Sequence, residues 1–217
     1  MDTSLVAALL ILDTAVFLAV VVMHLAKKHS ALIALYAAQS IAVSGMLLLI
    51  AREEHSASTY AVAAAIFLAK GALVPWLLRR LLAKGNIPAT SASYLSTPET
   101  LFGLLLVTLF VQTLLVPALA DLVRSPGLAF LALSALFASL LLALTRKGAL
   151  AQIVAILAIE NSLVAFVMLL GLRTHALLEF GIVLDILVWA FVASAFVGMI
   201  TRHFGSTDVT IMKQLSE

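Results

Sequence analysis

The sequence predicts an all-α integral membrane protein, and its composition, its long apolar runs and its lack of strand patterning all favour this class. Of its 217 residues, 64% are hydrophobic and only 11% are charged, and the mean hydropathy is +1.18. Soluble domains carry about 25% charged residues, so this chain has too few charges to cover the surface of a water-soluble globule. The apolar runs are also too long and continuous for barrel strands, which alternate in polarity over about 10 residues.

Seven apolar runs are long enough to cross a bilayer, which takes about 20 helical residues. We do not expect the first to be a cleavable signal peptide, because it follows Asp2, lacks a basic leader and exceeds the length of a signal core. Short connections, which make neighbouring helices antiparallel, separate the runs except at Ala83–Pro98, whose Gly, Pro and Ser content is typical of a loop or linker. The predicted spans are 4–26, 30–51, 57–82, 100–122, 127–145, 149–172 and 176–201.

Lysines and arginines divide unevenly between the two sides of these spans, nine against three. Because cytoplasmic loops carry the excess of Lys and Arg, we expect the N-terminus outside and the C-terminus in the cytoplasm. The sequence pI near 9.1 then reflects a basic cytoplasmic face rather than a nucleic-acid site. The richer side holds Lys27, Lys28, Arg79, Arg80, Lys84, Arg146, Lys147, Arg202 and Lys213, and the poorer side holds Arg52, Arg124 and Arg173.

A weak internal repeat divides the chain into units. We expect a three-helix unit at 1–82, a cytoplasmic loop with a linking helix at 83–126, and a second three-helix unit with a cytoplasmic tail at 127–217. The stretch Lys27–Ser40 ends in a Gln-Ser pair, and the stretch Arg146–Asn161 ends in a Glu-Asn pair. With one helix between them the two units would share one orientation, as in a parallel repeat. Chance similarity between apolar helices is the alternative.

The residue types present exclude several kinds of site. The absence of cysteine excludes disulfides, iron–sulfur clusters, cysteine zinc sites and a thiol nucleophile. The five histidines have no metal-site spacing, and neither a P-loop nor a nucleophile-elbow motif occurs. We therefore expect no catalytic residue, no metal and no cofactor in this chain.

Four charged residues lie deep within the predicted spans, namely Asp13, Lys70, Glu160 and Asp185. At 1.5 Å per helical residue each lies between about 13 and 20 Å from the start of its span, near the bilayer midplane. A charge there costs about 2.5–3.5 kcal/mol on insertion scales, so all four must face protein or water. Buried groups of this kind favour proton exchange, and their common depth indicates a lateral relay or a midplane site. A packing clamp of Lys70 with Glu160 or Asp185 is the structural alternative.

Two neighbouring features complete the candidate site. Pro75, five residues after Lys70, removes a helix donor and predicts a kink that frees carbonyls beside the lysine. Glu179 lies near the outer end of the last span. It is either a group where protons enter or leave, or an ordinary interfacial carboxylate near Arg173 and His175.

Stretches around these residues resemble the hydrogenase-4 component E (HyfE) family of membrane subunits, over most of the chain. The Ile-Glu-Asn element at Glu160 and the Gly-Ile-x-x-Asp element that ends at Asp185 are the most specific. The last three spans are also similar to the K subunit of respiratory complex I (NuoK-like), with Glu160 and Asp185 at its two acidic positions, although there the second acid is Glu and the basic loop lies nearer the first. The resembling stretches are Ala34–Val43, Ala64–Leu78, Thr145–Ser162, Leu178–Phe191 and Phe204–Leu215.

The resemblance implies a non-catalytic membrane-arm subunit of a complex I-related, group 4 [NiFe]-hydrogenase complex, such as a formate hydrogenlyase. Its expected location is a bacterial or archaeal cytoplasmic (inner) membrane, where it is multi-pass. The expected partners are antiporter-like and H-subunit-like membrane subunits and, through them, a hydrogenase-type cytoplasmic arm. That arm would hold the nickel–iron and iron–sulfur centres, so electron transport and the oxidoreductase chemistry belong to other subunits.

The resemblance also implies roles for residues in proton or sodium translocation. Glu160 and Asp185 would carry protons, Lys70 and Gln39 would be relay or tuning groups, and Asp13 is a further candidate proton-transfer group. Gln39 would stand where a degenerate first repeat has lost a carboxylate. Two alternatives stay open: a subunit of a multi-subunit cation/proton antiporter, and a structural membrane anchor for an enzyme.

Overall fold

The computed structural model describes residues 3–84, 89–123 and 125–169, which form an all-α bundle without β-strands. Within these residues, six helices are long and apolar enough to cross a membrane, and they coincide with the first six predicted spans. The seventh predicted span, 176–201, lies outside the described residues. The six helices support a multi-pass membrane protein by their length and composition.

Four of the six crossing helices are regular, and two contain a π-helical segment. The regular ones are α1 (Thr3–Leu25), α2 (His29–Glu54), α7 (Pro126–Thr145) and α8 (Ala149–Leu169). The third crossing consists of α3 (Ala57–Ile66), the π segment η1 (Phe67–Leu73) and α4 (Val74–Lys84). The fourth consists of α5 (Thr97–Phe110), the π segment η2 (Val111–Leu115) and α6 (Val116–Ala118).

Each π segment ends two residues before a proline. A proline has no N–H to donate and its ring clashes with the carbonyl four residues earlier. In each case the residue between the segment and the proline donates to the carbonyl five residues back, Val74 to Ala69 O and Val116 to Val111 O. The helix before Pro75 is therefore widened into a π turn, where the sequence predicted a kink. Lys70 lies within this widened turn.

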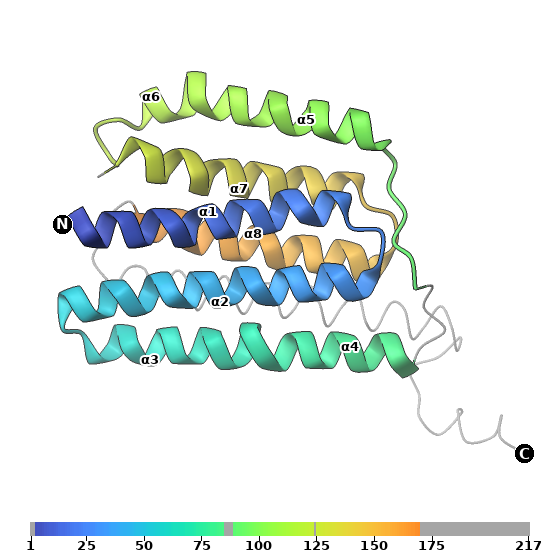
Figure 1. The fold of residues 1–217 in the computed structure, drawn as a ribbon, viewed down its shortest axis with the longest axis horizontal. Coiled ribbons are helices and arrows are strands. Elements are labelled where there is room, and N and C mark those ends of the chain that lie inside the picture. The colour runs from blue at the N-terminus through green and yellow to red at the C-terminus, as the bar shows by residue number, and fades with distance from the viewer. Residues whose placement is uncertain (1–2, 85–88, 124, 170–217) are drawn as a thin grey trace, which may run out of the picture.

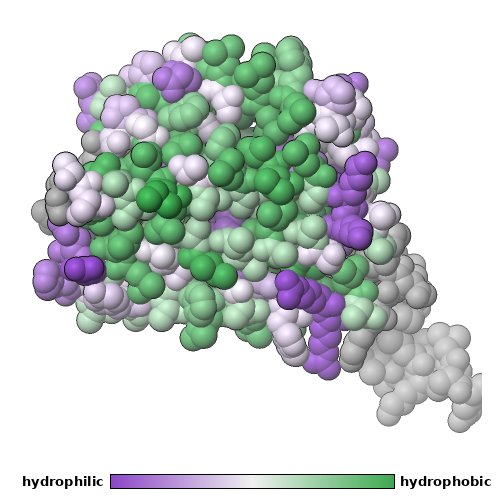
Figure 2. Space-filling view, viewed as in Figure 1, coloured by the Kyte–Doolittle hydropathy of each residue, from purple (hydrophilic) through white to green (hydrophobic). Residues whose placement is uncertain are grey.

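The bundle has a four-helix centre and two outer crossings (Figure 1). α1, α2, α7 and α8 pack on one another, the third crossing packs on α2, and the fourth crossing packs mainly on α7. Helices of both predicted three-helix units thus share one core. The outer surface is apolar, as the exposed Leu105 and Leu109 of α5 illustrate, and Figure 2 shows apolar residues between hydrophilic groups at the two ends of the bundle. Such a band suits contact with lipid.

Charged residues gather at the two ends of the bundle. The end we call the basic end carries Lys27, Lys28, Arg79, Arg80, Arg146 and Lys147. The opposite end carries Arg52, Glu53, Glu54 and Asp121.

The long loop is tied to the basic end more closely than its composition predicts. Its residues 89–94, here called the strap, run between two helix connections. On one side His29 donates to Ala89 O (3.1 Å) and Ser91 to Lys27 O (2.8 Å). On the other side Tyr94 donates to Thr145 O (2.8 Å) and Lys147 to Ala92 O (3.0 Å). The backbone groups of this loop segment are therefore satisfied by other connections and not only by water.

Gly148 is the residue in the connection to α8 where backbone conformation demands glycine. Its φ is +92°, and a Cβ there would meet no atom within 4 Å. Gly148→Ala should therefore lower the free energy of unfolding by about 1–2 kcal/mol through backbone strain alone. Gly127→Ala is the matched control, because its nearest contact, Leu10 Cδ1 at 4.0 Å, is an ordinary one. Unfolding both variants in detergent micelles tests this; equal stabilities would contradict it.

Candidate functional site

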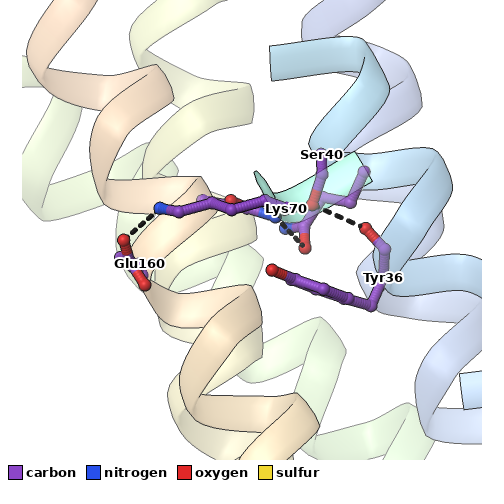
Figure 3. Close-up of polar contacts among 6 residues, drawn as sticks. Tyr36, Ser40, Lys70 and Glu160 are labelled. Carbon is purple, nitrogen blue, oxygen red and sulfur yellow. Dashed lines mark hydrogen bonds and ion pairs between the residues drawn. The ribbon is translucent and has the colours of Figure 1, made fainter. Parts of the chain in front are cut away.

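A buried ion pair joins the third crossing to α8. Lys70 Nζ of η1 donates to Glu160 Oε1 of α8, and their side chains are only 6% and 2% exposed. Figure 3 shows the lysine reaching from its helix across to the carboxylate. Of the pairings that the sequence left open for Lys70, the structure thus shows the one with Glu160. Each of these charges is costly to bury in an apolar span, and here the ammonium and the carboxylate pair with each other.

A row of polar side chains begins at Asn161, the residue after Glu160, and crosses the bundle centre. Asn161, next to Glu160, donates through Nδ2 to Ser40 Oγ (2.8 Å) and at 3.5 Å to Gln39 Oε1. Gln39 Nε2 in turn donates to Ser162 Oγ (3.0 Å), whose oxygen lies 3.2 Å from Ser139 Oγ. All five side chains are buried. We call these five residues, together with Lys70 and Glu160, the polar row.

The polar row lies between two apolar layers. The layer towards the basic end includes Met23, Leu32 and Leu150, and the layer towards the opposite end includes Leu9, Val43 and Met46. Because the row passes from the third crossing through α8 and α2 to α7, it runs across the bundle rather than from end to end. Of the four charges predicted to lie near the midplane, Lys70 and Glu160 belong to this row.

Tyr36 is a site residue that the sequence did not identify. It is fully buried on α2, one turn before Ser40, whose hydroxyl donates to the Tyr36 carbonyl (3.0 Å). Figure 3 shows its ring beside Lys70, with the hydroxyl directed to the side where Glu160 lies. Ser139 and Ser162 were missed as well. Single hydroxyl residues in apolar spans give no distinguishing signal, although Ser162 directly follows two polar residues.

Asp13 is a candidate that the structure does not join to the row. Its side chain is fully buried on α1, on the same face as Leu9 and Val16. Neither carboxylate oxygen has a hydrogen-bond partner among the described residues. Asp185 and Glu179, the other two predicted acids, lie outside those residues.

The groups brought together can hold a charge but offer no metal centre. Within the described ranges no three His, Cys, Asp or Glu side chains gather as metal ligands. The row instead supplies one ammonium, one carboxylate, two amides and three hydroxyls. Hydroxyls both donate and accept hydrogen bonds, so the hydrogen-bonded part of the row links α8 and α2 to α7.

Fold and site together define a multi-span α-helical protein with an ionisable pair at its centre. The chain is 27% identical to the uncharacterised protein Rv0085 of Mycobacterium tuberculosis over 191 residues, which are 86% of each chain. No family model matches it. No solved structure matches it either.

Proposed function

We propose that this chain is a non-catalytic membrane-arm subunit of a complex I-related [NiFe]-hydrogenase-type complex, where it contributes to proton or sodium translocation. The observation that carries the ion role is the buried Lys70–Glu160 pair, with buried hydrogen-bonded amides and hydroxyls starting at the next residue, Asn161. The assignment to a hydrogenase-type complex rests on the resemblance of the stretches around Glu160 to the HyfE family. The nickel–iron and iron–sulfur chemistry then belongs to partner subunits.

The pair offers a simple way to couple charge movement to partners. While Lys70 is charged, it stabilises an ionised Glu160 in a low-dielectric site. A neighbouring subunit that draws the lysine charge away makes the carboxylate take up a proton, and its return makes the carboxylate release one. Glu160 is thus the proton carrier, Lys70 controls its charge, and Gln39 with the serines extends the site towards α7.

We further propose the seven-span topology, with the N-terminus outside and the basic end in the cytoplasm, from the Lys and Arg distribution. A parallel repeat of spans 1–3 and 5–7 is supported by one contact. Ser40 and Asn161 close the corresponding stretches of the two units, and Asn161 Nδ2 of α8 donates to Ser40 Oγ of α2 (2.8 Å). A pseudo-two-fold axis along the membrane normal would place corresponding positions in this way.

Glu160→Gln, made in the full complex, tests the proposed ion role. Inverted membrane vesicles should lose proton uptake by tenfold or more, on the order of the contribution of one proton-transfer group. The matched control is Glu53→Gln, which removes an exposed carboxylate at the opposite end and should pump normally. Assembly is checked by copurification.

The same experiment separates the alternatives. Normal pumping in an assembled Glu160→Gln complex would overturn the proton-carrier role and leave a packing clamp in a structural anchor. Copurification with a nickel–iron subunit supports the hydrogenase-type complex, whereas copurification with antiporter-like subunits alone would indicate a cation/proton antiporter. Asp185→Asn extends the test to the acid outside the described residues.

A further inference from the structure

One exposed face of the third crossing, from the end of η1 into α4, changes from apolar to cationic towards the basic end. Leu73, Trp76 and Arg80 recur at the i, i+3, i+7 spacing that places side chains on one helix face. Leu73 is 50% exposed and Trp76 is 53% exposed. Arg80 Cζ lies 5.2 Å from the centre of the Trp76 ring, a cation–π contact that holds the guanidinium at the end of the apolar stretch. Arg79 is exposed beside it.

The other face of α4 is held firmly in the bundle. Val74 and Leu78 are 5% and 3% exposed and belong to the apolar layer near the basic end, with Leu81 and Leu82 packed against it. The exposed face is therefore presented by a packed helix and not by a free segment. Its residues keep their relative positions without help from a ligand.

The charge around this face is strongly positive. The basic end exposes Lys27, Lys28 and Lys147 in addition to Arg79 and Arg80. Among the described residues at that end the exposed acid is Glu99, which is already bonded to the Ser96 amide in a helix cap. The face thus complements an anion, and guanidinium groups are well suited to phosphate.

We propose that this face of α4 binds an anionic phospholipid. Its phosphate interacts with Arg79 and Arg80, and its acyl chain lies along Trp76, Leu73 and, further into the bilayer, Leu68, which is 63% exposed. A soluble acidic protein would satisfy the arginines but would leave the adjoining apolar surface uncovered, whereas a lipid matches both parts. The proposal does not depend on the function proposed above, because it concerns binding by the chain alone.

The proposed lipid site and the buried ion pair lie on the same crossing. Arg80 lies ten residues after Lys70 on the same crossing, about 15 Å along the helix. The expected place of such a lipid is the leaflet at the basic end.

The test is lipid retention by the purified full-length chain, measured by native mass spectrometry after exchange with phosphatidylglycerol or phosphatidylcholine. Wild type should retain phosphatidylglycerol in preference to phosphatidylcholine. The Arg79→Gln/Arg80→Gln variant should retain at least about tenfold less phosphatidylglycerol than wild type, since each arginine near anionic lipid contributes appreciably to binding. The control variant Lys27→Gln/Lys28→Gln removes the same amount of charge from the same end. It is expected to retain phosphatidylglycerol as well as wild type does.

Each other result decides against the site. Equal loss in the two double variants would show a diffuse basic surface, and equal retention of both lipids would show that charge plays no part. Competition by soluble polyglutamate as effective as by phosphatidylglycerol would indicate an acidic protein partner instead. Trp76→Ala provides a second test that keeps all charges: it should weaken phosphatidylglycerol retention, and unchanged retention would overturn the placement of the lipid on this face.

Discussion

Lys70→Met and Glu160→Met are each expected to lower the free energy of unfolding by about 3 kcal/mol, whereas the double variant should lie within about 1 kcal/mol of wild type. Either single change leaves one charge buried without its opposite, at 2–6% exposure. Such a charge at a helix centre costs about 2.5–3.5 kcal/mol on insertion scales. Removing both charges removes the cost as well. Unfolding of all four proteins in mixed micelles, compared as a double-mutant cycle, gives the coupling.

The cycle also checks the contact itself. If the double variant loses the sum of the two single losses, the two side chains do not interact and the pairing of η1 with α8 is wrong. Glu53→Met is a suitable control, because that carboxylate is exposed at the end of α2 and its loss should change stability by less than about 0.5 kcal/mol.

The cost of burying charge explains how much of the site was foreseeable from the sequence. Lys70 and Glu160 were identified because each interrupts an apolar run, but a run carries no information on which residue faces which across helices. Asp13 interrupts its run in the same way, and yet its side chain has no hydrogen bond within the described part of the chain. Tyr36 was missed because an aromatic residue in a span is ordinary until a neighbour from another helix is known.

The fold shows a similar division between local and long-range information. Spans 1 to 6 follow from local hydropathy, and Pro75 and Pro117 give a local reason for the two π segments. The strap was predicted as part of a loop or linker, because a Gly-, Pro- and Ser-rich composition does not distinguish a free loop from one whose backbone is hydrogen-bonded to other segments. Its partners at Lys27 and Thr145 are far away in the sequence, and short backbone pairings of this kind leave no periodic pattern.

Arg146→Met should lower the free energy of unfolding by about 3 kcal/mol, because charged hydrogen bonds contribute about 1.5–3 kcal/mol each. The buried guanidinium donates to the carbonyls of Met23 and His24, in the last turn of α1, and to Ser91 Oγ of the strap (3.3 Å). Last-turn carbonyls lack helical partners and favour a cation. Burial lowers the pKa of Arg146 from its ordinary value, but an arginine starts so high that it stays charged at neutral pH. Unfolding in micelles measures the loss.

Three comparisons test whether Arg146 acts as a latch, a side chain that holds the strap to the end of α1, or only as a surface charge. Arg146→Lys keeps the charge but not the forked donor geometry, so it should restore only part of the stability. Lys147→Met removes the adjacent, exposed cation and should have little effect on unfolding. Hydrogen exchange at the Ser91 and Tyr94 amides should accelerate in Arg146→Met, because the strap loses the side chain that ties it to α1. Wild-type exchange at both amides would show that backbone pairing alone holds the strap, and the latch role of Arg146 would then be wrong.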